Sequence, residues 1–127
     1  MKIEAELKYS KDHEWVRAEG NRAFVGITDH AQHSLGEIVF VELPEVGKML
    51  SEGGILGVVE SVKAASDVYT PIAGKVTAVN EDLVDKPGSI NESPYESWIA
   101  VLETSNDTAP DNLMDASAYE AFCAREE

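Results

Sequence analysis

The chain has 127 residues, the size of one domain with a hydrophobic core, and 43% of its residues are hydrophobic. Its 24 acidic and 10 basic residues give a formal net charge of −14, which repels nucleic acid and anionic membrane and excludes both as expected partners. Cys123 is the single cysteine, so no internal disulfide is possible, and this is typical of a reducing compartment.

The amino terminus matches neither a signal peptide nor an arginine-rich transit peptide. No apolar run reaches the length that a bilayer span needs. We therefore expect a cytoplasmic bacterial protein. No long apolar stripe is left over for a second copy of the chain, which favours a monomer.

Short β-prone runs, separated by turn signals such as Glu19-Gly20-Asn21, recur along most of the chain. The predicted strands are residues 14–18, 22–27, 38–43, 53–62, 67–70, 74–80 and 98–103. About seven short strands without alternating helices predict a mainly β fold, either a sandwich or a barrel.

Two helices interrupt this β pattern. Thr28 is a candidate N-cap for a short helix over residues 29–35, and Gly36 is placed to end it. Asp115 is placed to cap a C-terminal helix at about residues 115–125, with Cys123 buried on its apolar face. The polar segment 104–112 predicts a connector before that helix.

The sequence offers no catalytic constellation, so we expect a non-catalytic protein. His13, His30 and His33 match no metal-binding spacing, and there is no cysteine cluster. His30 and His33 fall about one turn apart on the predicted 29–35 helix, where a surface position is the simplest interpretation. The glycines of Gly53-Gly54-Ile55-Leu56-Gly57 indicate a turn or bulge, because the segment lacks the residues of a phosphate loop.

One lysine lies between two strand-like segments. Val62-Lys63-Ala64-Ala65-Ser66 has the small and polar residues of a tight connection, so Lys63 would be presented to solvent at the tip of a hairpin. A lysine ammonium on a flexible stem is a common target of acylation. The simpler interpretation is that Lys63 is an ordinary charged residue of a turn.

A resemblance to a known family favours acylation. The stretches that carry it are Leu7-Lys8-Tyr9, His13-Glu14-Trp15-Val16, Val25-Gly26-Ile27-Thr28-Asp29-His30-Ala31, Leu35-Gly36-Glu37-Ile38-Val39-Phe40-Val41-Glu42-Leu43-Pro44, Glu60-Ser61-Val62-Lys63-Ala64, Pro71-Ile72-Ala73-Gly74-Lys75-Val76 and Ile90-Asn91-Glu92-Ser93-Pro94-Tyr95-Glu96. In order along nearly the whole chain, they resemble the H protein of the glycine cleavage system. The resemblance implies one domain over residues 1–127, folded as a lipoyl-domain-like barrel-sandwich hybrid with its hairpin region at about residues 38–80.

The same resemblance implies a function, with lipoic acid attached covalently to Lys63. The carrier would take the aminomethyl group of glycine from a pyridoxal-phosphate glycine decarboxylase (P protein) to a tetrahydrofolate-dependent aminomethyltransferase (T protein). A dihydrolipoyl dehydrogenase (L protein) would then reoxidise it, and a lipoate ligase or a lipoyl/octanoyl transferase would modify it. The alternative within this class is a relay that donates lipoyl groups to other lipoate-dependent enzymes.

Two acids match positions that receive the loaded arm in the family. Glu14 and Asp67 would meet the protonated amine in a surface cleft, although both residue types are also common as solvated loop acids. Asp12 replaces an expected uncharged residue, so the resemblance assigns it no role. Glu96-Ser97-Trp98 departs from the family pattern, being one residue shorter and lacking a glycine.

Two other classes compete with the lipoyl carrier. A biotin carrier places methionines beside its lysine, whereas Val62 and Ala64 flank Lys63 here. A non-carrier interaction module predicts no modification of Lys63 at all.

Overall fold

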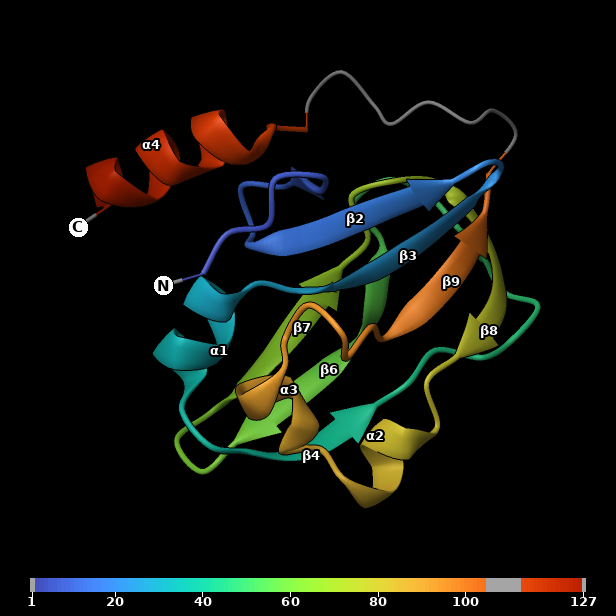
Figure 1. Cartoon of the computed structure of the whole chain (residues 1–127). Coiled ribbons are helices and arrows are strands. Elements are labelled where there is room, and N and C mark those ends of the chain that lie inside the picture. Colours follow the sequence, from blue (N-terminus) through green and yellow to red (C-terminus); the bar gives the residue numbers. More distant parts are fainter. Residues whose placement is uncertain (1, 105–112, 127) are drawn as a thin grey trace.

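The computed structural model describes residues 2–104 and 113–126, which form two β-sheets with short helices around them (Figure 1). The strands are β1 (Lys8–Tyr9), β2 (Glu14–Glu19), β3 (Arg22–Ile27), β4 (Ile38–Glu42), β5 (Met49–Leu50), β6 (Ile55–Ser61), β7 (Ala65–Tyr69), β8 (Gly74–Val79) and β9 (Ala100–Glu103). The helices are α1 (Asp29–Leu35), α2 (Asp82–Asp85), α3 (Ser89–Glu92) and α4 (Ala116–Glu126).

The larger sheet has the strand order β1-β2-β3-β9-β8-β5, and the smaller sheet has the order β4-β6-β7. All strand pairs in the described parts of the chain are antiparallel. The main core contains buried side chains of both sheets, among them Val25 and Val76 of the larger sheet and Val59 of the smaller one. Buried and exposed residues alternate over the first four positions of β8, whereas Ala100, Val101 and Leu102 of β9 are all buried.

Close approach of β4 to β6 requires a glycine. A Cβ atom at Gly57 would collide with the backbone oxygen of Glu42, so a larger residue would push the two strands apart. Leu56 and Val59 of the same strand point into the core and are almost fully buried. The strand that leads to the predicted hairpin is therefore anchored on both its backbone and its side chains.

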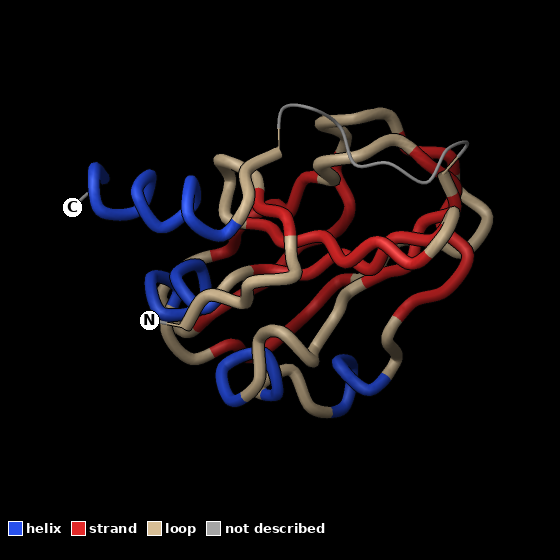
Figure 2. Tube along the Cα trace, turned by 45° about the horizontal axis from the view of Figure 1, so that its top comes forward, coloured by secondary structure: helices blue, strands red, loops and turns tan. Residues whose placement is uncertain are grey.

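The C-terminal helix α4 packs on β1 through a second, more aromatic cluster. The rings of Tyr9 and Tyr119 stack with their centroids 4.4 Å apart, and Cys123 is buried beside them. Tyr9 also exchanges two backbone hydrogen bonds with Met114, of 2.8 and 2.7 Å. Figure 2 shows α4 at one edge of the molecule, on the same side as α1.

Both predicted helices are confirmed. Thr28 caps α1 by accepting a hydrogen bond from the Ala31 N–H, and Gly36, with φ of 86°, ends it. Asp115 accepts a hydrogen bond of 2.8 Å from the Ala118 N–H and so caps α4. Most of the predicted 104–112 connector lies outside the described residues.

All seven predicted strands form, with changes at their ends. Strand β6 begins at Ile55 rather than at residue 53, because residues 51–54 form a turn closed by a Gly54 N–H to Ser51 carbonyl hydrogen bond of 2.9 Å. Strand β9 begins at Ala100 rather than at residue 98. Strands β1 and β5 and helices α2 and α3 were not predicted, since segments of two to four residues carry too little periodicity.

Among the described residues, no helix has the length and apolar character that crossing a membrane requires.

Candidate functional site

The predicted hairpin joins β6 to β7 through residues 62–64, with Lys63 at its tip. The buried Ser61 hydroxyl oxygen accepts hydrogen bonds from the N–H groups of Lys63, at 3.2 Å, and Ala64, at 3.1 Å. Ser61 also donates two hydrogen bonds to the Ala64 carbonyl oxygen, one from its own N–H at 2.8 Å and one from its hydroxyl at 3.2 Å. One serine therefore fixes the turn, and Val62, which is 65% exposed, contributes little packing to it.

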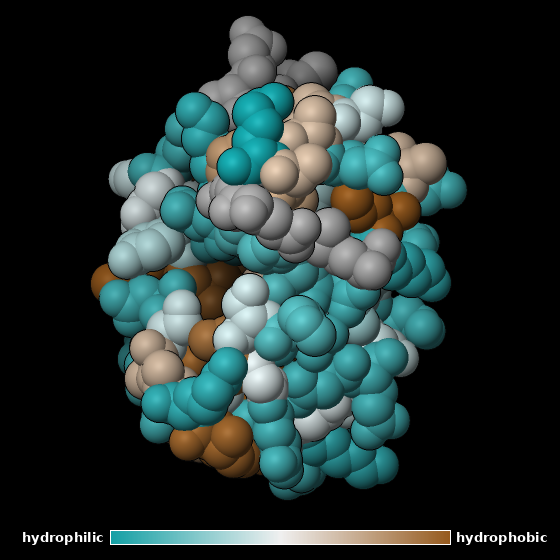
Figure 3. Space-filling view, turned by 90° about the vertical axis from the view of Figure 1, so that its left-hand side faces the viewer, coloured by the Kyte–Doolittle hydropathy of each residue, from teal (hydrophilic) through white to brown (hydrophobic). Residues whose placement is uncertain are grey.

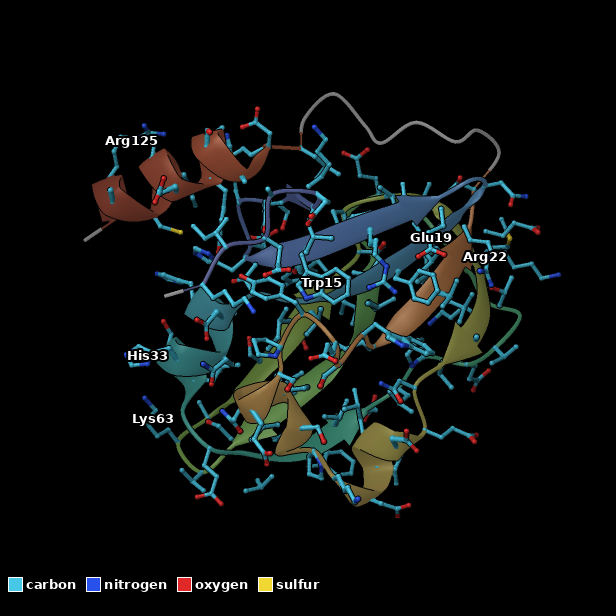
Figure 4. The ribbon with its side chains drawn as sticks, viewed as in Figure 1. Trp15, Glu19, Arg22, His33, Lys63 and Arg125 are labelled. Carbon is cyan, nitrogen blue, oxygen red and sulfur yellow. The ribbon has the colours of Figure 1, made fainter. Side chains whose placement is uncertain are left out.

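The Lys63 side chain is exposed and reaches across to the end of α1. Its Nζ donates a hydrogen bond of 2.9 Å to the backbone oxygen of Ser34. Its Cε would lie only 3.2 Å from a Cβ atom added at Gly36, so the glycine leaves room for the lysine stem. Figure 4 shows Lys63 on the same side of the molecule as His33 of α1. A single exposed hydrogen bond is easily broken, so Nζ is accessible to an acylating enzyme.

Glu14, at the start of β2, is almost completely buried, with 2% of its surface exposed. Its carboxylate accepts hydrogen bonds of 2.7 Å from the Ser10 hydroxyl and 3.0 Å from the Tyr69 N–H. Burial raises the pKa of Glu14 from 4.5 to about 7, because desolvation outweighs the two hydrogen bonds, while the negative charge of Asp12 raises it further. Near neutral pH the group can therefore hold or release a proton.

Glu14 and Asp67 line the same small cavity, of about 310 Å³. Asp67 is an exposed residue of β7, paired with Val58 of β6. The remaining lining residues come from the turn before β2, from β3, from α1 and from β7: Asp12, His13, Ile27, His30, Ala31, Ser34, Leu35, Ser66 and Val68. Viewed from the side of α1, the surface is mainly hydrophilic, with hydrophobic side chains at the bottom of a hollow (Figure 3).

Ser34 connects the three predicted site residues, because its carbonyl oxygen accepts a hydrogen bond from Lys63 and the same residue lines the cavity of Glu14 and Asp67. Asp12, to which the sequence assigned no role, also lines this cavity. A group attached at Lys63 would start at the rim of an apolar and acidic hollow.

Sequence reasoning missed the role of Ser10. Its hydroxyl hydrogen-bonds both the carboxylate and, at 3.1 Å, the N–H of Glu14, within a tight turn closed by a Ser10 N–H to Glu14 carbonyl bond of 2.9 Å. A serine four residues before an acid is too common a pattern to indicate this contact. The available sequence signal was the polar run before β2. That run predicts a turn, but it does not predict which side chain the turn brings into contact with Glu14.

The prediction that both histidines of α1 lie on the surface is confirmed for His33 and wrong for His30. His33 is exposed as predicted, whereas His30 is partly buried and its ring stacks on that of His13, with centroids 4.1 Å apart. His13 is 17 residues away in sequence and takes a positive φ of 66°, which the pattern alone does not indicate. Both histidines line the cavity.

The structure has two antiparallel sheets around a shared core, and an exposed lysine on a serine-fixed hairpin beside an acidic cavity. These features define a carrier domain of the lipoyl type. The model of the family described as glycine cleavage H-protein matches residues 7–126 of the chain. The chain belongs to this glycine cleavage H-protein family.

Individual relatives agree with this membership over nearly the whole length. The chain is 58% identical over 126 residues to the glycine cleavage system H protein of Thermoanaerobacter sp. (strain X514), covering 99% of this chain and 100% of the relative. It is 51% identical over 123 residues to the mitochondrial glycine cleavage system H protein 2 of Arabidopsis thaliana, covering 96% and 79%. The crystal structure of a glycine cleavage system H protein from Mycobacterium marinum superposes with a TM-score of 0.86 at 35% identity, covering 96% and 99%. The predicted lipoyl-domain-like fold is thereby confirmed.

Proposed function

We propose that this chain is the lipoyl carrier of a glycine cleavage system and that lipoic acid is joined by an amide to Nζ of Lys63. The observation that carries the assignment to Lys63 is its place at the exposed tip of a hairpin that Ser61 holds in one shape. Family membership supports the carrier role, which is non-catalytic. The residues fit the group, because an exposed amine on a rigid turn is what a modifying enzyme must reach.

The neighbours of Lys63 favour access. Ala64 and Ala65 are exposed and carry only a methyl group, so a ligase can approach the turn without meeting long side chains. Acylation would remove the positive charge of Nζ and extend the arm to a length on the order of 10–15 Å, estimated from bond lengths. That reach allows the arm to leave the surface or to fold back over α1.

The carrier role implies several partners. When attached, the lipoyl group supplies a reducible disulfide that accepts the aminomethyl group of glycine and gives it up again. The chain would dock in turn on glycine decarboxylase (P protein), aminomethyltransferase (T protein) and dihydrolipoyl dehydrogenase (L protein). A lipoate ligase or a lipoyl/octanoyl transferase would modify Lys63. With a net charge of −14, the chain favours basic docking faces on these proteins.

Glu14 and Asp67 would hold the cationic end of a loaded arm. A protonated amine entering the cavity lowers the pKa of Glu14 and favours its carboxylate form, so the charge forms where the amine arrives. Asp67 adds a second carboxyl at the more exposed side of the cavity. We propose a location in the bacterial cytoplasm, supported by the bacterial origin of similar H proteins, and a monomeric state.

The test is glycine–bicarbonate exchange catalysed by glycine decarboxylase with the lipoylated chain as acceptor. Lys63→Arg should abolish exchange, whereas Lys75→Arg, an exposed lysine of β8, should leave it unchanged. Glu14→Gln and Asp67→Asn should retain lipoylation but hold the loaded arm less tightly, measured as faster loss of the aminomethyl group to solvent. Full exchange by Lys63→Arg would contradict the proposal.

A further inference from the structure

Three side chains that the carrier role does not use meet between α1, α4 and the turn before β2. They are His13 from the turn, His30 from α1 and Cys123 from α4. One ring nitrogen of each histidine and the Cys123 sulfur all lie within 4.8 Å of one another. The residues come from three separate parts of the chain, so local sequence spacing, the usual sign of a metal site, is absent.

His30 contains a polar atom for which the described structure offers no partner. Its Nδ1 is buried and makes no hydrogen bond, although nearly all buried polar atoms in native proteins have a partner. The ring lies against His13, with centroids 4.1 Å apart and planes 14° from parallel. Imidazole binds metal ions in its neutral form, through a ring nitrogen that carries no proton.

His13 already has the outer contact that a metal-bound histidine usually makes. Its Nδ1 lies 2.7 Å from the Tyr119 hydroxyl, which in turn lies 2.8 Å from the Thr28 hydroxyl. In the tautomer with the proton on Nδ1, His13 donates to Tyr119 and coordinates through Nε2. Such a hydrogen bond on the second nitrogen orients the ring and raises its basicity as a ligand.

We propose that His13, His30 and Cys123 bind a zinc-class metal ion. Two imidazole nitrogens and one thiolate are a borderline-soft donor set, which selects Zn²⁺ and its analogue Co²⁺ over Mg²⁺ and Ca²⁺. Binding deprotonates the Cys123 thiol: the sulfur bonds to the ion and the proton leaves to solvent. Three protein ligands leave the fourth tetrahedral position to water.

Binding requires one local rearrangement. A metal ion lies in the plane of each coordinating imidazole, so two rings cannot stay stacked and share one ion. Tyr119 restrains His13, so His30, whose Nδ1 makes no hydrogen bond, is the ring that turns. Rotation about the last side-chain torsion of a histidine meets a broad, shallow energy profile.

The ion would tie α4 to α1 beside the cavity of Glu14. His13 and His30 line that cavity, so a bound ion would form part of its wall. An ion that binds the folded chain and not the unfolded chain raises the stability of the folded state. Occupancy of the metal site should therefore also strengthen the docking of α4 on the sheet. The proposal stands apart from the carrier role, since it holds or fails with Lys63 unmodified.

The experiment is a Co²⁺ titration of the full-length chain carrying Lys63→Arg, so that no lipoyl sulfur competes. We expect a thiolate-to-cobalt charge-transfer band together with the visible bands of a tetrahedral site, displaced by one equivalent of Zn²⁺. Cys123→Ser should abolish the charge-transfer band, and His30→Ala should abolish the site. His33→Ala, which removes the exposed histidine of the same helix, is the matched control and should titrate as the parent does.

A second measurement separates coordination from misfolding. Circular dichroism identifies variants that fold, and Cys123→Ala replaces Cys123→Ser if the buried hydroxyl prevents folding. Tyr119→Phe keeps all three ligands but removes the contact to His13, so Co²⁺ affinity should fall roughly 10–100-fold. Absence of the band in the parent, or its persistence in a folded His30→Ala variant, would overturn the proposal.

Discussion

The Lys63 ammonium nitrogen lies 2.9 Å from the backbone oxygen of Ser34, in the last turn of α1. This contact joins the hairpin tip to the wall of the cavity that contains Glu14 and Asp67. A lysine held at the rim by one exposed hydrogen bond is positioned but not buried. The same place would let an arm on Lys63 either reach outward or fold back into the cavity.

Because that hydrogen bond is exposed, Lys63 should contribute little to stability. We expect Lys63→Ala to change the free energy of unfolding by less than about 0.5 kcal/mol. Leu56→Ala, a 1% exposed core position on the same hairpin, should cost about 2–5 kcal/mol. Urea unfolding of the three proteins measures both values, and a large loss in Lys63→Ala would show that the lysine is structural.

Ser61 should matter for both the shape and the modification of the hairpin. Ser61→Ala removes the acceptor for two N–H groups, so we expect a loss of about 1–2 kcal/mol in unfolding free energy. Lipoylation of Lys63 should also slow, because the turn samples more conformations. Ser66→Ala is the matched control, since the Ser66 hydroxyl makes a single long contact of 3.4 Å. Equal lipoylation rates in the two variants would contradict this role.

Glu14 should make the chain less stable as pH rises. Its pKa is about 7 when folded and 4.5 as the reference value, so between these pH values the folded state binds more protons than the unfolded state. By linkage, the stability that Glu14 contributes is fully present below about pH 4.5. The free energy of unfolding then falls by on the order of 3 kcal/mol as pH rises through 7. Glu14→Gln should remove this component. Urea unfolding of both proteins across pH 5–8 isolates it as their difference, and parallel curves would contradict the assignment.

Ser10 should tune that titration. Its hydroxyl donates to the Glu14 carboxylate and so lowers the pKa that burial raises. Ser10→Ala should therefore raise the pKa of Glu14 above its value in the parent chain. Carbon-13 NMR of the Glu14 carboxyl carbon, followed against pH, measures this directly. A pKa that stays the same or falls would show that the hydroxyl does not stabilise the charged form.

The sequence predicted the parts of this site that depend on local signals. The hairpin around Lys63 follows from β-prone runs flanking small residues, and α1 follows from Thr28 and Gly36, which act within one turn of the chain. The cap of α4 by Asp115 is equally local. Glu14 and Asp67 were predicted as site residues from the resemblance to a known family and not from their spacing in the sequence.

The parts that the sequence did not predict depend on contacts distant in the chain. The Tyr69 N–H that binds Glu14 is 55 residues away, and His13 meets Tyr119 across 106 residues. Strand β5 is two residues long and forms only because β8 pairs with it. Such contacts arise from the packing of the two sheets, which a single sequence does not specify residue by residue.

Attachment of lipoic acid to Lys63 is tested most directly by the intact mass of the chain after incubation with lipoate, ATP and a lipoate ligase, followed by peptide mapping. We expect one added lipoyl group, located on Lys63, in the parent and in Lys75→Arg, and none in Lys63→Arg. A lipoyl group on another lysine, or no addition while a known carrier is modified in the same tube, would show that Lys63 is not the attachment site.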